Sequence, residues 1–597
     1  MDGCLNNISR YVYNGAKSCD EPQRLRNGNI QFSKSKDYNS GSNSVSIGSY
    51  AGMSSGAGSN VSVGFRAGGS AADSNVAVGY YAMGLVAAGS QNVAIGNVAS
   101  SVLKGSYTTT IGSQAGRFAS GSNNTFMGYK AGYGGTTSAP YSSGQYNVAL
   151  GTEALKGFTT GGSNVAIGYQ AADAITTAVE NLAIGRGALG SATTQNRNIA
   201  MGYFSAANLT GASAEFNVFI GDYAGQGGSG NLKRSVAVGY QVLQSTAGND
   251  VDGAIGIGYQ ALNDVTSGDQ NIAIGYQAGD GITTTTGTIS IGAAALGGIT
   301  TTGDYTIAIG HGAMGGAEIG DGNIAIGYQS MQNANAAGFH RNIAIGYQTM
   351  ANVGSNGPDD NIALGYTALN DITTGGYNVG IGSYVLENLT TGTDNVAVGF
   401  VAGRRITGTH NVSIGSYAHD YGYGSTKSIA IGYQSAQYST GSFNTFVGYQ
   451  AGRGGTNSAP FSSGENNVAV GYYALRNVTT GGNNVAIGKS SSPAITTGLG
   501  NVSIGVSANE SSTTGGSNVA IGYNSHRYIS GGDKNIAIGY AALQSSGTPA
   551  NNDAQYNIGI GYWALLAITD GDNNTVLGNL AASAMTTTSN TVIIGVE

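Results

Sequence analysis

The sequence is short of charge. Only 9% of its 597 residues are Asp, Glu, Lys or Arg, against about 25% in ordinary soluble domains. The formal net charge of −7 is spread thinly, and no basic stripe is present that could follow a phosphate backbone. This composition argues against an ordinary globular enzyme and against a nucleic-acid-binding protein.

Long apolar runs and cysteines are also scarce. No stretch approaches the roughly 18 apolar residues of a membrane helix, and the start MDGCLNNISRYVYNG does not read as a secretory signal peptide. Cys4 and Cys19 both precede the repeats described below, where they either form one local disulfide or remain free thiols. We therefore expect no membrane insertion, and the two cysteines do not indicate a compartment.

Catalytic motifs are missing as well. The five histidines lack metal-ligand spacing, and His311 stands where Tyr is usual. No nucleophile lies beside a base in a known motif, and no glycine-rich loop ends in Gly-Lys-Ser or Gly-Lys-Thr. Turns such as Gly268-Asp269 offer oxygen ligands for calcium but do not match the calcium-binding nonapeptide, which favours ordinary turns. We expect no enzyme activity, no cofactor and no metal site.

One short repeat dominates what is present. Copies of the unit Asn-Val-Ala-Ile-Gly-Tyr-Gln-Ala, with variation at most positions, occur 32 times, with central glycines from Gly48 to Gly595, mostly 16 to 19 residues apart. Three longer steps predict surface loops at residues 133–146, 453–466 and about 545–556. Because 40% of the residues are hydrophobic and the aliphatic ones hold fixed positions, disorder is a poor interpretation.

Within each unit the aliphatic residues alternate. The residue before the central glycine is Ile, Val, Leu or Met in all 32 copies, and the residue two earlier is Val, Ile, Leu or Thr. This period of two predicts a β-strand with one buried face, so we expect pairs such as Ile272 with Ile274, and Val468 with Val470, to point inward. The residue between them is small in 27 copies, and we expect this outer face to pack against a neighbouring chain.

Three further columns follow from the repeat. Asn begins the strand in 24 copies, where its amide can bond to the same amide one coil away and fix the register. The central glycine permits a tight bend. Tyr follows it in 16 copies, which predicts either stacked ladders or a glycan-contacting face. Because one unit cannot bury its apolar residues alone, the sequence predicts an all-β parallel β-solenoid of about 32 coils.

A second level of repetition is visible. The segment 124–151, NTFMGYKAGYGGTTSAPYSSGQYNVALG, recurs at 444–471 as NTFVGYQAGRGGTNSAPFSSGENNVAVG, an offset of 320 residues. Duplication of a block of about eighteen coils accounts for it. In these loops Tyr133, Tyr141, Arg453 and Phe461 are candidates for receptor or inter-chain contact, because binding residues often project on loops from a rigid scaffold.

The motif N-x-V-A-I-G-x-x-A resembles the head repeat of YadA-type trimeric autotransporter adhesins, and NNVAIGYQAL with TTG-rich spacers resembles repeats of bacteriophage tail-fibre proteins. The resemblance covers about residues 40–597 and implies a left-handed parallel β-roll in a homotrimeric rod, with the small strand residues at the chain interface. The sequence shows no heptad stalk or membrane-barrel anchor, and its unit is nearer seventeen residues than the adhesin's fourteen. These departures favour a virion fibre, or another self-assembling extracellular filament, over a bacterial surface adhesin.

Residues 1–39 lack the repeat and precede the repeat domain of residues 40–597. They are a candidate capping or attachment segment, in which Tyr11, Tyr13, Arg24 and Arg26 are candidate assembly contacts. The open last coil, NTVIIGVE, is a further candidate docking point, because an unpaired strand edge invites pairing.

The sequence thus predicts a structural or adhesive fibre on a virion or outside the cell, most simply a phage tail-type fibre that contributes to host attachment. Expected partners are the chain itself, as a homotrimer or polymer, a virion baseplate or tail protein through residues 1–39, and a cell-surface glycan. The alternative is a self-assembling extracellular filament or cell-surface adhesin. A carbohydrate-active enzyme is a weaker third possibility, because Asp and Glu total only 31 and rarely lie in the strands.

Overall fold

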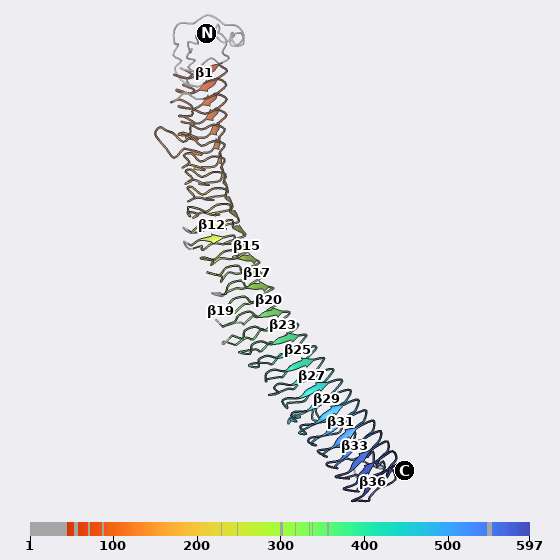
Figure 1. Ribbon diagram of the computed structural model, residues 1–597. Helices are drawn as coiled ribbons and strands as arrows, with labels where there is room; N and C mark the ends of the chain where they lie inside the picture. Colours follow the sequence, from red (N-terminus) through yellow and green to blue (C-terminus); the bar gives the residue numbers. More distant parts are fainter. Residues whose placement is uncertain are drawn as a thin grey trace, which may run out of the picture. The chain divides into compact units, whose positions relative to one another are not determined.

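The computed structural model describes residues 44–52, 58–69, 72–85, 89–227, 230–246, 249–298, 303–316, 318–333, 335–336, 338–354, 357–545, 548 and 552–596. These residues form an all-β parallel β-solenoid with about one repeat strand per coil, and none of them is helical (Figure 1). The predicted fold class is confirmed. The candidate assembly contacts Tyr11, Tyr13, Arg24 and Arg26, and both cysteines, lie outside the described residues, as does part of the predicted loop near 545–556.

The chain divides into two compact units, residues 1–166 and 167–597. The first unit contains β1 (Val45–Ile47), β2 (Val61–Val63), β3 (Val76–Val78), β4 (Val93–Ile95), β5 (Thr109–Ile111), β6 (Thr125–Met127) and β7 (Val148–Leu150), and the boundary falls within β8 (Val165–Ile167).

The second unit contains β9 (Leu182–Ile184), β10 (Ile199–Met201), β11 (Val218–Ile220), β12 (Leu232–Lys233), β13 (Val236–Val238), β14 (Val251–Asp252), β15 (Ile255–Ile257), β16 (Ile272–Ile274), β17 (Ile289–Ile291), β18 (Ile307–Ile309), β19 (Glu318–Ile319), β20 (Ile324–Ile326), β21 (Asn335–Ala336), β22 (Ile343–Ile345), β23 (Ile362–Leu364), β24 (Val379–Ile381), β25 (Val396–Val398), β26 (Val412–Ile414), β27 (Ile429–Ile431), β28 (Thr445–Val447), β29 (Val468–Val470), β30 (Val485–Ile487), β31 (Val502–Ile504), β32 (Val519–Ile521), β33 (Ile536–Ile538), β34 (Ile558–Ile560), β35 (Thr575–Leu577) and β36 (Val592–Ile594).

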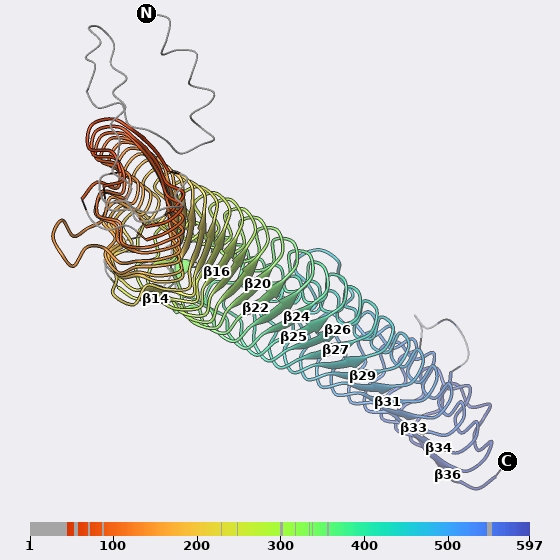
Figure 2. The same cartoon turned by 90° about the horizontal axis from the view of Figure 1, so that it is seen from above.

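Each repeat strand pairs in parallel with the equivalent residues of the next coil. Ile272, for example, lies opposite Ile289, and Ala273 lies opposite Ser290. In Figure 2 the strands β16 to β36 form one row along the same side of the coils. Two short pairs, β12 with β14 and β19 with β21, add local ladders elsewhere on the second unit. Side chains at equivalent repeat positions therefore form columns along each unit.

The strands face the opposite way from the sequence prediction. The small middle residue is buried, as with Ala273 at 0% exposed, whereas Ile274 beside it is 37% exposed. The expected inward pairs Ile272 with Ile274, and Val468 with Val470, therefore flank the buried position, and the prediction of their facing was wrong. The physical reason is the narrow interior of each coil, in which a small strand residue leaves room for a larger side chain from the opposite wall.

The opposite wall is formed by the fourth residue after the central glycine. Leu262 and Leu475 occupy this position and are fully buried. Where the strand carries Phe instead of Ala, the opposing residue is glycine: a Cβ on Gly452 would overlap the ring of Phe446, and Gly132 faces Phe126 in the same way. Large and small residues thus exchange sides while the interior volume is kept.

The asparagine column is confirmed. The backbone N–H of Asn378 donates to Oδ1 of Asn361 at 2.9 Å, and that of Asn395 donates to Oδ1 of Asn378 at 3.0 Å. The amide of Asn378 also donates to the carbonyl of Gly392 in the next coil. These asparagines are buried, so each amide satisfies backbone groups that would otherwise lack partners and fixes the register of neighbouring coils.

The column of central glycines is required by close packing of successive turns. Gly275 has a φ of 142°, and a Cβ on it would overlap the carbonyl of Gly292 one coil away. Any other residue would strain the backbone and separate the coils.

Candidate interaction surfaces

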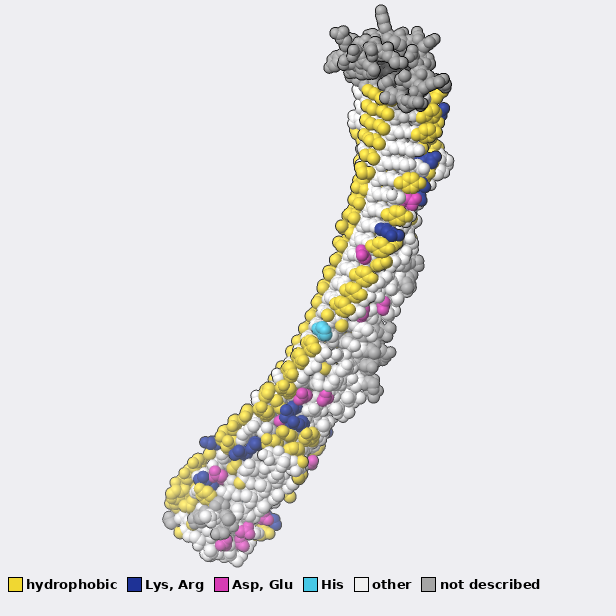
Figure 3. Space-filling model, turned by 180° about the vertical axis from the view of Figure 1, so that it is seen from behind, with side chains coloured by type: hydrophobic (Ala, Val, Ile, Leu, Met, Phe, Trp, Pro, Cys, Tyr) yellow, Lys and Arg dark blue, Asp and Glu magenta, His cyan; other side chains and the backbone are white. Residues whose placement is uncertain are grey.

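An aliphatic column runs along the outer face of the strands. Its members are the residues that precede the central glycines, and they range from half-buried to exposed. Those in the second unit that expose more than a third of their surface are Ile220, Ile257, Ile274, Ile345, Ile381, Ile414, Val470, Ile487, Ile504, Ile560 and Ile594. Figure 3 shows hydrophobic side chains gathered in bands that follow the stacking direction. We call this column, together with the tyrosines after the glycines, the aliphatic-tyrosine face.

The tyrosines of this face stack on one another. Ring centroids of Tyr240 and Tyr259 are 5.4 Å apart with an interplanar angle of 13°, and those of Tyr259 and Tyr276 are 5.1 Å apart at 7°. His311 joins a similar stack through Tyr328 at 5.5 Å, so it takes the place of a tyrosine in the column. Tyr276 is still 56% exposed, because the ring of Tyr259 covers only one side of it and the next coil has the small Ala293 at this position.

An apolar face of this extent is unusual on a single soluble chain. Contiguous apolar patches above a few hundred Å² usually mark an interaction site. Charged side chains are rare in the column, so water contacts aliphatic and aromatic carbon along much of the second unit. The arrangement can bury a large area against a matching partner. The sequence prediction placed the aliphatic residues inside the coil and therefore missed this face.

The first insertion loop folds back on the coil wall. Its exposed tip is residues 137–140, and the side chains of Tyr133 and Tyr141 both contact Phe118 one coil away, with ring centroids 5.0 and 6.3 Å apart. The guanidinium of Arg117 lies 4.9 Å from the Phe118 centroid. The two predicted loop residues therefore share one aromatic and cationic cluster, and Tyr141 is not the projecting tip of the loop.

The second insertion loop repeats this arrangement with more partners. Phe461 contacts Tyr421 at 5.1 Å and Tyr438 at 6.4 Å, and Arg453 lies over the Tyr438 ring at 5.1 Å. Arg405 lies 4.3 Å from the Tyr421 centroid. The predicted residues Arg453 and Phe461 are therefore brought together on the wall, and residues 457–460 form the exposed tip.

A buried ionic group supports the second cluster. Asp420 is 2% exposed and accepts hydrogen bonds from Arg404 at 3.0 Å and Arg405 at 3.1 Å. Burial raises the pKa of Asp420, while the two arginines act in the opposite direction. His419, the residue before Asp420, is fully buried inside the coil, and burial lowers its pKa to about 4. The histidine is therefore neutral at pH 7.

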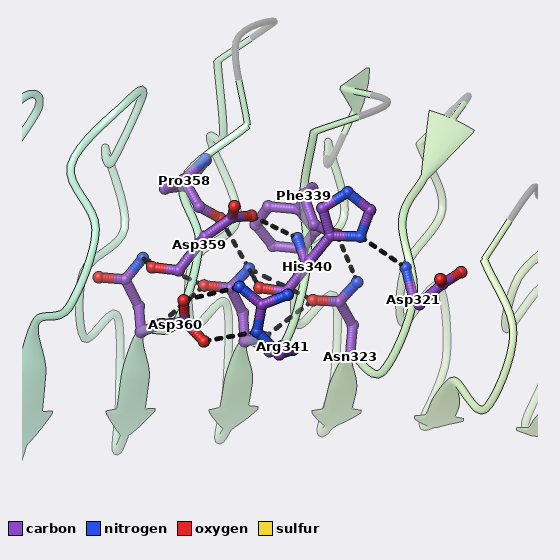
Figure 4. A network of polar contacts seen from close by, with 10 residues as sticks. Asp321, Asn323, Phe339, His340, Arg341, Pro358, Asp359 and Asp360 are labelled. Atoms are coloured by element: carbon purple, nitrogen blue, oxygen red, sulfur yellow. Dashed lines mark hydrogen bonds and ion pairs between the residues drawn. The ribbon is translucent and has the colours of Figure 1, made fainter.

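A polar network lines the turns before β20, β22 and β23 (Figure 4). The N–H of Asp321 donates to Nδ1 of His340 at 2.9 Å, and the N–H of His340 donates to Asp359 at 2.7 Å. Arg341 forms a two-pronged ion pair with Asp360, which lowers the pKa of that carboxyl. These side chains cap backbone donors of adjacent coils, so the network serves the stacking of turns.

In the described part of the chain, no three His, Cys, Asp or Glu side chains lie together in a way that could hold a metal ion. No helix among the described residues is long and apolar enough to cross a bilayer.

No protein-family model matches the chain, and no curated protein matches it with significant similarity.

Proposed function

We propose that this chain is a structural fibre protein that assembles with copies of itself, as a homotrimer, through the aliphatic-tyrosine face. The proposal rests on the column of half-buried to exposed aliphatic residues, one per coil, of which Ile487 and Ile504 are among the exposed ones. Exposed apolar surface repeated over this many coils would favour aggregation unless a partner covers it.

A copy of the same chain is the partner that fits the face best. Its aliphatic residues recur once per coil, at the strand spacing of about 4.8 Å. A surface with a different axial repeat would fall out of step with this column within a few coils. A second copy carries the same repeat, so every aliphatic side chain can meet an equivalent one along the whole contact.

The resemblance to trimeric adhesin heads and tail fibres supports three copies, with one change to the expected interface. The small strand residues, expected between chains, are buried within each chain, as Ala273 is. The flanking aliphatic residues and the tyrosines then form the interface. Burial of such residues contributes about 25 cal/mol per Å² of apolar surface.

The assembled fibre would act on a virion or outside the cell, with host attachment as its role. Support comes from the scarcity of charge and from the two aromatic clusters at the insertion loops, which offer surface for a receptor or for lateral packing. Attachment to a baseplate or tail protein through residues 1–39 belongs to the same proposal. A self-assembling extracellular filament is the alternative, and electron micrographs of long fibrils instead of discrete particles would favour it.

Oligomeric state tests the interface. Light scattering after gel filtration should give the mass of three chains for the wild type and a lower mass for the variant Ile487→Lys with Ile504→Lys. The matched control is Thr497→Lys with Thr514→Lys, which adds the same charge to exposed turn positions of the same two coils and should leave the trimer intact. A monomeric wild type at micromolar concentration would contradict the proposal.

A further inference from the structure

A groove of about 360 Å³ is cut into the second unit, across the coils that follow β8, β9, β10 and β11. One wall follows the second residue after each central glycine and includes Phe204 and Tyr223. The other wall follows the fifth and sixth residues and includes Asp173, Asn208 and Gln226. Four coils at the strand spacing make the groove about 14 Å long from first to last coil.

The groove exists because one coil carries glycine in both walls. Gly187 stands at the second position and Gly190 at the fifth, so at these two positions the coil after β9 contributes no side chain, and only the small Ser191 follows at the sixth. The ring of Phe204 leans over Gly187, where an added Cβ would lie only 2.7 Å from it. The gap left by the two glycines is therefore shaped by an aromatic side chain of the next coil.

The aromatic wall departs from the usual residue at that position. Other coils commonly carry Gln there, and these glutamines bond to one another along the column, as Gln277 does to Gln260 at 3.1 Å. Phe204 and Tyr223 interrupt that column with rings at an interplanar angle of 17° and centroids 6.3 Å apart. Two stacked rings from adjacent coils therefore form an apolar, aromatic stretch of this wall.

The opposite wall is polar. Gln226 accepts a hydrogen bond from Gln244 at 2.9 Å, which orients its amide, and the side chain of Asn208 is exposed. Asp173 adds a carboxylate to the same wall. An elongated groove with an aromatic wall on one side and amide and carboxylate groups on the other can bind a ligand that has an apolar face and a hydroxylated edge.

We infer that this groove binds a short stretch of a saccharide chain, with pyranose rings packed against Phe204 and Tyr223 and their hydroxyls bonded to Asp173, Asn208 and Gln226. A pyranose ring has the required pair of surfaces, since its C–H groups lie on one face and its hydroxyls at the rim. The inference rests on the proposed role in host attachment and names the chemical class of the receptor.

A glycan array of bacterial lipopolysaccharides and free oligosaccharides, followed by calorimetry on each hit, tests the inference. The intact protein should bind at least one saccharide. The variant Phe204→Gln with Tyr223→Gln, which restores the common residue of the column, should weaken binding by about tenfold or more. Ser191→Trp, which places a bulky side chain in the groove, should abolish saccharide binding. The control Tyr473→Gln changes an aromatic residue at the same position of a coil outside the groove and should bind normally.

Light scattering separates this inference from the proposed function. All four proteins should remain trimeric. Trimeric wild type that binds no saccharide at millimolar concentration, or that binds equally after both groove changes, would overturn the inference and leave the assembly proposal standing. Binding of an aromatic peptide in the groove without any saccharide would overturn it as well.

Discussion

The two insertion loops follow the same backbone path, but the coil walls on which they pack have different side chains. In the first loop the N–H of Ser142 donates to the carbonyl of Phe118 at 3.1 Å, and in the second the N–H of Ser462 donates to that of Tyr438 at 3.0 Å. Both loops leave and rejoin the coil at equivalent positions and expose equivalent tips. The glycine and serine pattern shared by the two segments therefore determines the path of the chain.

The walls beneath the loops differ. The difference lies two coils before the coil that carries each loop. At the fourth position after its central glycine, the first copy has Ser100, whose hydroxyl bonds to that of Thr110 at 2.9 Å, and the second copy has the buried His419. At the fifth position Ser101 corresponds to Asp420, which pairs with two arginines. The solenoid backbone therefore tolerates exchange of wall and interior residues, provided that the interior volume and the hydrogen bonds are kept.

The largest expected effect comes from the interior that the two copies share. Phe446→Ala should destabilise the coil by about 3–5 kcal/mol, because it leaves a cavity opposite Gly452. Adding Gly452→Leu recreates the Ala and Leu pairing of other coils and should recover most of the loss. Because long repeat arrays do not unfold in two states, hydrogen exchange of amides in β28 and β29 is the suitable measurement. Failure of the second change to rescue would contradict the volume argument.

The buried histidine should make the second copy, and not the first, sensitive to acid. The pKa of His419 falls from 6.5 to about 4 on folding because of burial. Below pH 6.5 the unfolded chain therefore binds a proton that the folded chain does not, and stability falls until pH 4, by up to about 3 kcal/mol.

Hydrogen exchange corrected for intrinsic rates, measured at pH 7 and pH 5, checks this difference. The coil of His419 should open more readily at pH 5, while the coil of Ser100 should not change. His419→Ser imports the residue of the first copy and should remove the difference. An acid response that survives this substitution would show that another group is responsible.

The ionic group predicts a smaller effect. Asp420→Asn removes the charge that pairs with Arg404 and Arg405 and should destabilise the second cluster by about 1–2 kcal/mol, since both arginines are partly exposed. Salt titration of the wild type should show only part of this loss, because the buried carboxylate is shielded from ions. Loss of the same size from Ser101→Ala in the first copy would mean that the charge is irrelevant.

The smallest effect is expected from exchanging the loop aromatics. Tyr141→Phe and Phe461→Tyr make each loop carry the residue of the other, and both changes should alter stability by less than about 0.5 kcal/mol. Thermal denaturation followed by circular dichroism should show superimposable curves. A clear loss in Tyr141→Phe would indicate that the hydroxyl group of Tyr141 has a specific partner, and a clear loss in Phe461→Tyr would indicate that the second wall has no room for a hydroxyl group.

Sequence reasoning reached the fold, the asparagine column and the glycine column because each depends on local chemistry repeated in every coil. It reversed the strand faces, because alternation defines two faces and does not say which is inside. The signal was present in the pairing of Phe446 with Gly452 and of Phe126 with Gly132, large residue against small.

The loop aromatics could not be placed from sequence alone. Tyr141 packs against Phe118, a residue one coil away whose proximity depends on the stacking register. The groove at Phe204 was missed for a related reason. The groove forms where Gly187 and Gly190 of one coil have no side chains and where the ring of Phe204 leans in from the next coil.

The most direct test is a cryo-electron microscopy structure of the intact particle at side-chain resolution. We predict three chains in cross-section, with the column that contains Ile274, Ile487 and Ile504 facing the neighbouring chains and Ala273 inside its own coil. A particle of one chain with this column in contact with solvent, or a coil that encloses Ile274 and exposes Ala273, would contradict the account.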